Sequence, residues 1–150
     1  MRRVRSNDGA SAVEFAIVLP LLVMFLFGII VFGLAFARAQ GMEATAREAA
    51  RVASVARDVD TTEVEQAARD ATPPFINSDH IDVFVCDDEY EGDPAQCPDD
   101  WCEERGDRVQ VTVRIAEQYS SDYALSMPLW SGVEPDFESY GVFRCEAERE

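Results

Sequence analysis

The sequence predicts an α+β fold in which one long N-terminal helix packs on a small antiparallel sheet. Three observations indicate this fold. Residues 15–37 form an uncharged and mostly apolar run, residues 38–57 continue in an alanine-rich helical pattern, and the strand-like segments all follow residue 80. A chain of 150 residues has room for one such helix and one domain of modest size.

Residues 15–37 are expected to span a membrane. A helix rises about 1.5 Å per residue, so this run reaches roughly 35 Å and exceeds the hydrocarbon core of about 30 Å. Arg2, Arg3 and Arg5 precede the run, and basic residues concentrate on the cytoplasmic side of a span. We therefore expect a single-pass protein in the cell membrane, with the lipid bilayer as a partner, a cytoplasmic N-terminus and an exported C-terminal part.

The helical pattern continues beyond Arg38, so we expect one helix over about residues 10–57. Glu43–Arg47 and Glu48–Arg51 have the spacing of favourable helical ion pairs, and Gly41 is the expected weak point. A stripe of small and apolar residues recurs at helical spacing and predicts a packing face. Its members are Met42, Ala46, Ala49, Val52 or Ala53, and Ala56.

Residues 58–150 are expected to form an acidic exported domain. They contain 25 Asp and Glu against 6 Arg, a net charge of −19, which argues against nucleic acid as a partner. A short helix is expected at 63–71, before Pro73 and Pro74, and strands at 81–86, 108–117 and 139–146. The segment 127–130 is expected to be a loop that tucks apolar side chains under the sheet.

All four cysteines fall in this acidic part. Cys86, Cys97, Cys102 and Cys145 are an even number in an oxidising compartment, which predicts two disulfides with three possible connectivities. The spacing of Cys97 and Cys102 would also permit zinc, but no histidine lies beside them. Disulfides are therefore the favoured interpretation, and no metal is expected.

Residues 87–104 carry nine acidic and no basic residues, so a calcium site is one alternative for this segment. Carboxylates suit this cation, but the order of acids does not reproduce the EF-hand loop. A solvated surface is the favoured interpretation.

Motifs of catalysis are lacking in the sequence. His80 is the only histidine, and no G-x-S-x-G element or phosphate-binding glycine loop occurs. We expect neither an enzyme nor a cofactor.

Glu14 stands directly before the apolar run, where a charge is unfavourable unless it is compensated. It could lie at headgroup level, stabilised by the dipole at the helix N-terminus. Alternatively, cleavage after Gly9 would make Ala10 the first residue and Glu14 the fifth. The new amine of one subunit could then neutralise the carboxylate of the next.

The N-terminal part resembles TadE-like proteins, which are minor pilins or pseudopilins of Tad (Flp) pili in the type IV pilus superfamily. The resemblance is carried by Gly9-Ala10-Ser11-Ala12-Val13-Glu14-Phe15, by Val18-Leu19-Pro20-Leu21-Leu22 and by Ala44-Thr45-Ala46-Arg47-Glu48-Ala49-Ala50-Arg51. It is close over residues 9–57 and looser at 106–113 and 144–146.

This resemblance implies that residues 1–9 are a leader that a prepilin peptidase removes between Gly9 and Ala10. It also implies that Glu14 and Phe15 serve in peptidase recognition and subunit pairing. The expected partners are this peptidase and, through the N-terminal helix, pilin subunits and other Tad components. The expected function is the assembly or initiation of adhesive pili. By the same analogy, Cys86 would pair with Cys97 or Cys102, and Cys145 with the remaining cysteine.

Two other interpretations stay open. Ala35-Phe36-Ala37 resembles a signal-peptidase site, and cleavage there would release a soluble acidic domain that begins at Arg38. The chain could also remain uncut, as a membrane anchor that carries an acidic binding domain. The N-terminus of the mature protein separates these three interpretations.

Overall fold

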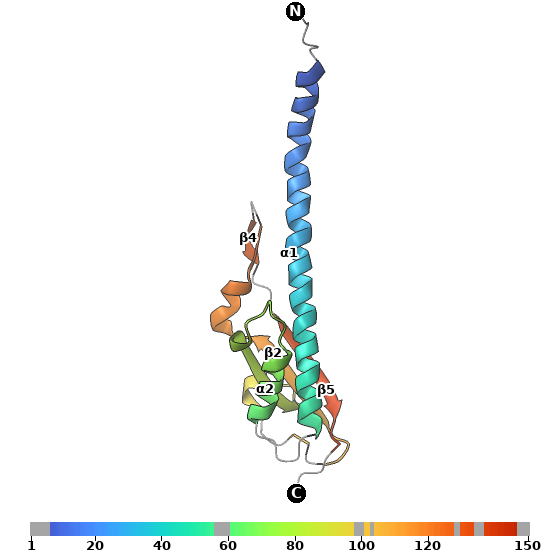
Figure 1. The fold of residues 1–150 in the computed structure, drawn as a ribbon. Helices are drawn as coiled ribbons and strands as arrows, with labels where there is room; N and C mark the ends of the chain where they lie inside the picture. The colour runs from blue at the N-terminus through green and yellow to red at the C-terminus, as the bar shows by residue number, and fades with distance from the viewer. Residues whose placement is uncertain are drawn as a thin grey trace, which may run out of the picture.

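The computed structural model describes residues 7–55, 61–97, 101–102, 104–127, 130–133 and 137–146. In this structure a long N-terminal helix packs on a small three-stranded antiparallel sheet (Figure 1). The predicted α+β fold is therefore confirmed.

Helix α1, Asn7–Val55, has 49 residues and a length of about 74 Å at the usual helical rise. Its N-terminal half projects away from the domain, whereas its C-terminal half is part of the domain (Figure 1). The helix was expected over 10–57. It begins earlier, at Asn7, and residues 56 and 57 lie outside the described residues. Pro20 and Gly41 both lie within α1, and neither interrupts it.

Gly41 is a packing site rather than the weak point of the helix. A Cβ atom at this position would lie 2.6 Å from Cγ of Pro73 and 3.4 Å from a ring carbon of Phe75. Glycine is therefore required because α1 comes very close to the segment that follows the second helix. The low helix propensity of glycine is offset here by that contact.

Helix α2, Thr61–Ala71, packs on α1 through Val64 and Ala68, which are fully buried. The hydroxyl of Thr45 on α1 is 3.0 Å from the carbonyl oxygen of Gly41 and 3.4 Å from that of Ala71. This buried hydroxyl therefore has acceptors on both helices.

The main sheet has the order β1-β2-β5, with β1 Ile81–Asp87, β2 Arg108–Ile115 and β5 Glu138–Arg144. Both pairings are antiparallel, and Val111 lies opposite Val85 on one side and Gly141 on the other. Val109, Val111 and Val113 are fully buried, as their alternation with polar residues predicts. Strand β2 stops two residues before the expected end, because Ala116 leads into the 3₁₀ segment Glu117–Tyr123 and its N–H bonds the carbonyl of His80 at 2.8 Å.

The helix and the sheet approach each other closely at Gly141. A Cβ atom there would lie 2.5 Å from the carbonyl oxygen of Ala46 and 2.8 Å from Cα of Arg47. The face of α1 that meets the sheet and α2 consists mostly of small side chains, which permit this approach. Its fully buried members are Met42, Thr45, Ala46, Ala49, Ala50 and Ala53.

Met127 and Trp130, which were predicted to belong to a loop, are strand residues instead, and residues 128 and 129 of that loop lie outside the described residues. Strands β3, Leu125–Met127, and β4, Trp130–Val133, pair antiparallel as a separate two-stranded sheet. This hairpin lies beside α1 and points toward its N-terminal end (Figure 1). Two further short 3₁₀ segments are Ser78–His80 and Pro94–Gln96.

Candidate functional site

The predicted processing site lies in the first turns of α1. Gly9, Ala10 and Glu14 are all exposed, and Phe15 is 62% exposed. Nothing lies within 4 Å of where a Cβ on Gly9 would be, so the fold accommodates a side chain there. Residues 1–6 of the predicted leader lie outside the described residues.

The helix places Ala10 and Glu14 on one face. Residues four apart in an α-helix lie one above the other, separated by an axial rise of about 6 Å. Phe15 follows about 100° further around the helix and therefore faces another direction. Among the ion pairs that the structure describes, none involves Glu14. Its carboxylate is thus available to a cation from outside the fold.

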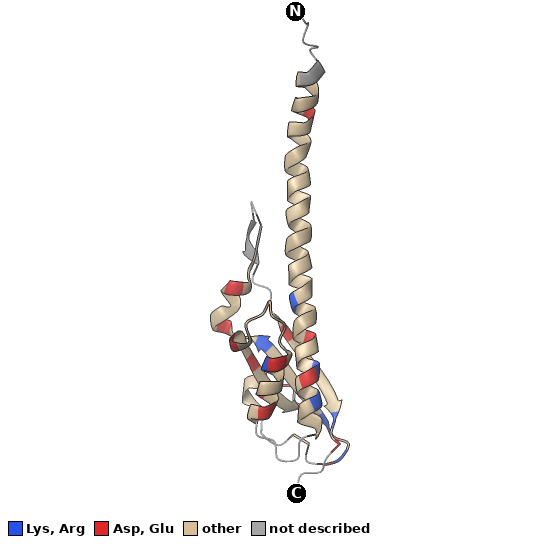
Figure 2. Cartoon of the chain, in the orientation of Figure 1, with Lys and Arg blue, Asp and Glu red and all other residues tan. Residues whose placement is uncertain are grey.

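Most of the segment after Phe15 is exposed, and only Gly28, Val31, Ala35 and Ala37 within 16–37 are half-buried. One stretch of α1 is long and apolar enough to cross a membrane, with a mean hydropathy of 3.0, and none of that stretch is buried in the fold. Charged residues gather on the domain, and the N-terminal half of α1 is almost free of them (Figure 2). The large exposed side chains include Ile17, Met24, Phe25, Ile29, Phe32 and Phe36.

Beyond the apolar segment, the exposed face of α1 carries the two predicted ion pairs. Glu43 pairs with Arg47, and the Arg51 guanidinium donates to both carboxylate oxygens of Glu48 at 2.6 and 3.1 Å. The hydrogen bonds from Arg51 hold the pKa of Glu48 below its usual value. These pairs favour helix in the stretch that connects the apolar half to the core.

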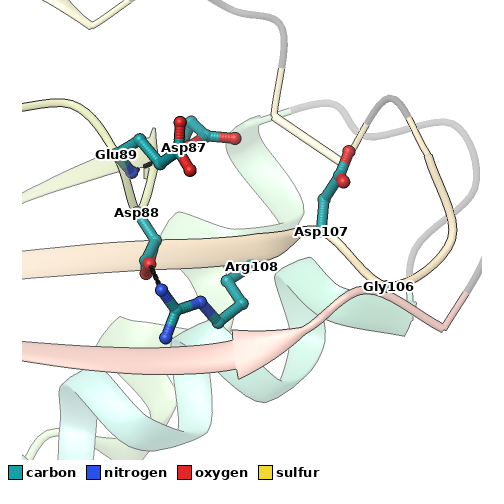
Figure 3. Close-up of a pocket in the computed structure, with 6 residues that line it drawn as sticks. All are labelled: Asp87, Asp88, Glu89, Gly106, Asp107 and Arg108. Carbon is teal, nitrogen blue, oxygen red and sulfur yellow. Dashed lines mark hydrogen bonds and ion pairs between the residues drawn. The ribbon is translucent and has the colours of Figure 1, made fainter.

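The acidic segment after β1 forms a hollow of about 380 Å³ that several carboxylates line (Figure 3). Each of three carboxylates already has a partner in the fold: Asp88 pairs with Arg108 at 2.5 Å, Asp87 accepts from the N–H of Glu89 at 2.8 Å, and Asp107 accepts from the N–H of Glu104 at 2.7 Å. Within the described ranges, no three potential ligands converge as a metal site requires. The calcium alternative therefore gains no support here.

His80 is part of a packed aromatic cluster. Its ring stacks on Tyr119 with centroids 3.8 Å apart, and its Nδ1 lies 3.1 Å from the hydroxyl of Tyr123. The same hydroxyl accepts the N–H of Asn77 at 3.1 Å. These contacts fix the start of β1 against the segment 117–123.

The cysteines form two disulfides. Cys86 pairs with Cys97, with Cα atoms 5.5 Å apart, and Cys102 pairs with Cys145, with Cα atoms 5.6 Å apart. This connectivity follows the pattern that the family resemblance implies, and it leaves no thiolate for zinc. The second disulfide ties the loop before β2 to the end of β5. There the N–H of Glu146 also bonds the carbonyl of Ser54 on α1 at 3.0 Å.

The chain thus combines one folded α+β domain with a helix whose exposed, apolar half could span a membrane. Residues 9–51 match the model of the protein family described as TadE-like protein, which confirms the resemblance over this segment. The match supports a protein that is associated with the Tad pilus. No curated protein matches the chain, and no solved structure does.

The match includes Gly9, Ala10, Glu14 and Phe15 and ends before the acidic domain. Two structural features were missed by the sequence reasoning. Gly141 lies alone within a strand pattern, and such a glycine can signal close backbone approach. The contact of Arg38 with Tyr123, 85 residues away in the chain, has no comparable signal.

Proposed function

We propose that this protein is a minor pilin or pseudopilin that acts in the assembly or initiation of Tad-type adhesive pili. In this proposal residues 15–37 span the membrane, the N-terminus is cytoplasmic and the acidic domain is exported. The observation that carries the proposal is the family match, which begins at Gly9 and runs through Glu14 into the exposed apolar helix. The role is structural, and no catalytic step is assigned to the chain.

A prepilin peptidase would cut between Gly9 and Ala10. This peptide bond is exposed, in the first turns of a helix where backbone N–H groups lack helical partners. Glycine destabilises a helix by about 1 kcal/mol relative to alanine, which helps this turn to open for the peptidase. Cleavage would remove Arg2, Arg3 and Arg5 and create an amine at Ala10.

Glu14 would then pair with the new amine of a neighbouring subunit. A parallel helix displaced by four residues, about 6 Å along the axis, would bring its Ala10 amine level with this carboxylate. Charges attract more strongly in a medium of low dielectric constant, so the pair would select one register in a bundle of apolar helices. Unpaired, the carboxylate would oppose burial of the helix end in lipid or protein.

The experiment is to determine the mature N-terminus by mass spectrometry after expression with the cognate peptidase. An N-terminus at Ala10 supports the proposal. Arg38 would instead indicate a secreted domain, and Met1 or Arg2 an uncleaved anchor. Gly9→Val should retain the leader, and Gly33→Val is its control, because a Cβ meets nothing within 4 Å at either position.

Glu14→Gln separates pairing from processing. This variant keeps the size of the side chain but removes its charge, so we expect it to enter pili poorly even when it is cleaved. Incorporation at the wild-type level would refute the role of the carboxylate in pairing, whatever the processing result.

A further inference from the structure

His80 lies where the main sheet meets the 3₁₀ segment η3, Glu117–Tyr123, which in turn contacts Arg38 of α1. We propose that His80 is a pH-sensitive switch: the neutral imidazole holds η3 against the start of β1, and the protonated imidazole releases it. The inference goes beyond the proposed function, and it requires neither insertion into a membrane nor cleavage of the leader.

In the described part of the chain, the imidazole contacts three side chains. Its ring stacks on Tyr119 with an interplanar angle of 8°, its Nδ1 lies 3.1 Å from the Tyr123 hydroxyl, and its Nε2 lies 3.2 Å from the side-chain nitrogen of Asn77. Tyr119 and Tyr123 belong to η3, and Tyr123 is buried whereas His80 is only half-buried. The imidazole thus joins η3 to the start of β1 and remains in reach of solvent.

The orientation of Asn77 determines which ring nitrogen carries the hydrogen. The carboxamide oxygen of Asn77 accepts the N–H of Asp79 at 3.1 Å, so the NH₂ group of Asn77 faces Nε2. Because an NH₂ group only donates, Nε2 must be unprotonated and accept. Nδ1 then carries the hydrogen and donates it to the Tyr123 hydroxyl, which also accepts the N–H of Asn77. This network is complete only when the imidazole is neutral.

A proton on Nε2 would place an N–H donor opposite the NH₂ group of Asn77. Rotation of the carboxamide would bring its oxygen to Nε2, but it would turn the NH₂ group toward the N–H of Asp79 and remove the cap of the segment Ser78–His80. In either case one hydrogen bond is lost and two donors face each other. Histidine is the side chain that ordinarily changes its charge between pH 5 and 8, so the switch is expected in this interval.

The elements around His80 carry both acids and arginines. These are Asp79 and Asp82 beside it in the chain, Glu117 and Asp122 on η3, Arg69 on α2, Arg114 on β2 and Arg38 on α1. Asp79 and Asp82 face Arg69 and Arg114 at 3.8 and 3.9 Å. Among the ion pairs that the structure describes, none includes the imidazole. These acids therefore offer Nε2 no acceptor that would compensate for the bond to Asn77.

Release of η3 would reach α1 through Tyr123. The Arg38 guanidinium donates to the carbonyl of Tyr123 at 3.4 Å, which is long for a hydrogen bond, and its Nε is buried with no partner among the described residues. In addition, η3 packs less extensively on α1 and the main sheet than these elements pack on each other. The contact at Arg38 is therefore weak by itself, and η3 depends on His80 to hold Tyr123 in place.

The test is hydrogen exchange of the full-length chain in neutral detergent at about pH 8 and about pH 5.5, on either side of the ordinary histidine transition. The readout is the protection factor, which is the exchange rate relative to an unfolded peptide at the same pH. The amides of Tyr119 and Ala124 report on η3, because they bond the carbonyls of Ala116 and Ser121. We expect their protection to fall by about tenfold at the lower pH, as for the loss of one hydrogen bond, while Val111 in the central strand stays protected.

Two variants change the response in different ways. Asn77→Asp has almost the same size and can still cap Asp79, but it presents a carboxylate oxygen to Nε2 in place of the NH₂ group. Protonation then creates an ion pair, so the protection of η3 should stay constant or rise as the pH falls. His80→Phe keeps a ring that can stack on Tyr119 but does not titrate, so its protection should be equal at both pH values.

Wild-type protection in η3 that is the same at both pH values would overturn the switch. An equal fall in Asn77→Asp or His80→Phe would also overturn it, because the responsible proton would then bind elsewhere. If Val111 loses protection together with η3, the domain opens as a whole and the switch is again refuted. If His80→Phe does not fold, the comparison of the wild type with Asn77→Asp decides the question.

Discussion

Replacing Gly141 by alanine should destabilise the fold, although alanine is normally more favourable than glycine within a strand. The added Cβ would lie 2.5 Å from the carbonyl oxygen and 2.7 Å from the carbonyl carbon of Ala46. Both atoms belong to the backbone of α1, so no side-chain rotation relieves the overlap. Strand β5 and α1 would have to separate.

The size of the effect follows from this geometry. Ordinary contacts of a Cβ begin near 3.4 Å, so the helix and the strand must move apart by close to 1 Å. Overpacking a well-filled core costs about 1–3 kcal/mol, and a backbone-to-backbone clash belongs at the upper end. We expect Gly141→Ala to lower the free energy of unfolding by about 3 kcal/mol on this scale.

The measurement is denaturant unfolding of the full-length chain in detergent, followed by the fluorescence of buried Trp101. Gly33→Ala is the matched control, because nothing lies within 4 Å of its Cβ position. It should be neutral or raise stability by up to about 1 kcal/mol through helix propensity. Ala46→Gly should not rescue Gly141→Ala, since the clash is with the backbone of residue 46. An unfolding midpoint for Gly141→Ala equal to that of the wild type would refute the close approach.

The disulfides and the helical ion pairs give two further predictions. Replacing Cys102 and Cys145 by serine should lower the free energy of unfolding by about 4 kcal/mol, and replacing Cys86 and Cys97 by about 3 kcal/mol. The first disulfide is worth more because it closes a loop with a sequence separation of 43 residues, whereas the second closes one of 11. Non-reducing denaturation curves check the order, and a larger loss for the shorter loop would contradict it. Glu48 has a lowered pKa in the folded chain, so its contribution to stability is present above the usual glutamate pKa and disappears as the pH falls through the lowered value. The stability difference between the wild type and Glu48→Gln should follow that pH course by circular dichroism, and a difference that persists in acid would count against the pair.

Much of the fold could be predicted because its signals are local and periodic. An uncharged run, an alanine stripe and an alternating strand each repeat over several residues, and Met42, Ala46, Ala49 and Ala53 are indeed fully buried. The sequence also gives a signal at Gly141, because this glycine stands within a strand pattern. These features follow from the helix and strand periods alone.

The rest depends on contacts between distant parts of the chain. Gly41 was predicted to be the weak point of the helix because the residue that it contacts, Pro73, lies far away in the sequence, after α2. Strand β3 has only three residues, too few to show a period, and it is in contact with α1, which lies far from it in the sequence. At the candidate site, the sequence predicted the residue types and their spacing, whereas the exposure of Glu14 and its neighbours on α1 is known only from the structure.

Because α1 runs without interruption from Gly9 into the core, mechanical load has a direct path through the molecule. A force applied at Ala10 would be transmitted along α1 to its contact with β5. It would load this contact in shear over its whole length, rather than separate the two elements from one end. The far end is fastened by the bond from Glu146 to Ser54 and by the adjacent Cys102–Cys145 cross-link. In the proposed pilin role, this arrangement would help the chain to resist stretching when it is pulled from the membrane.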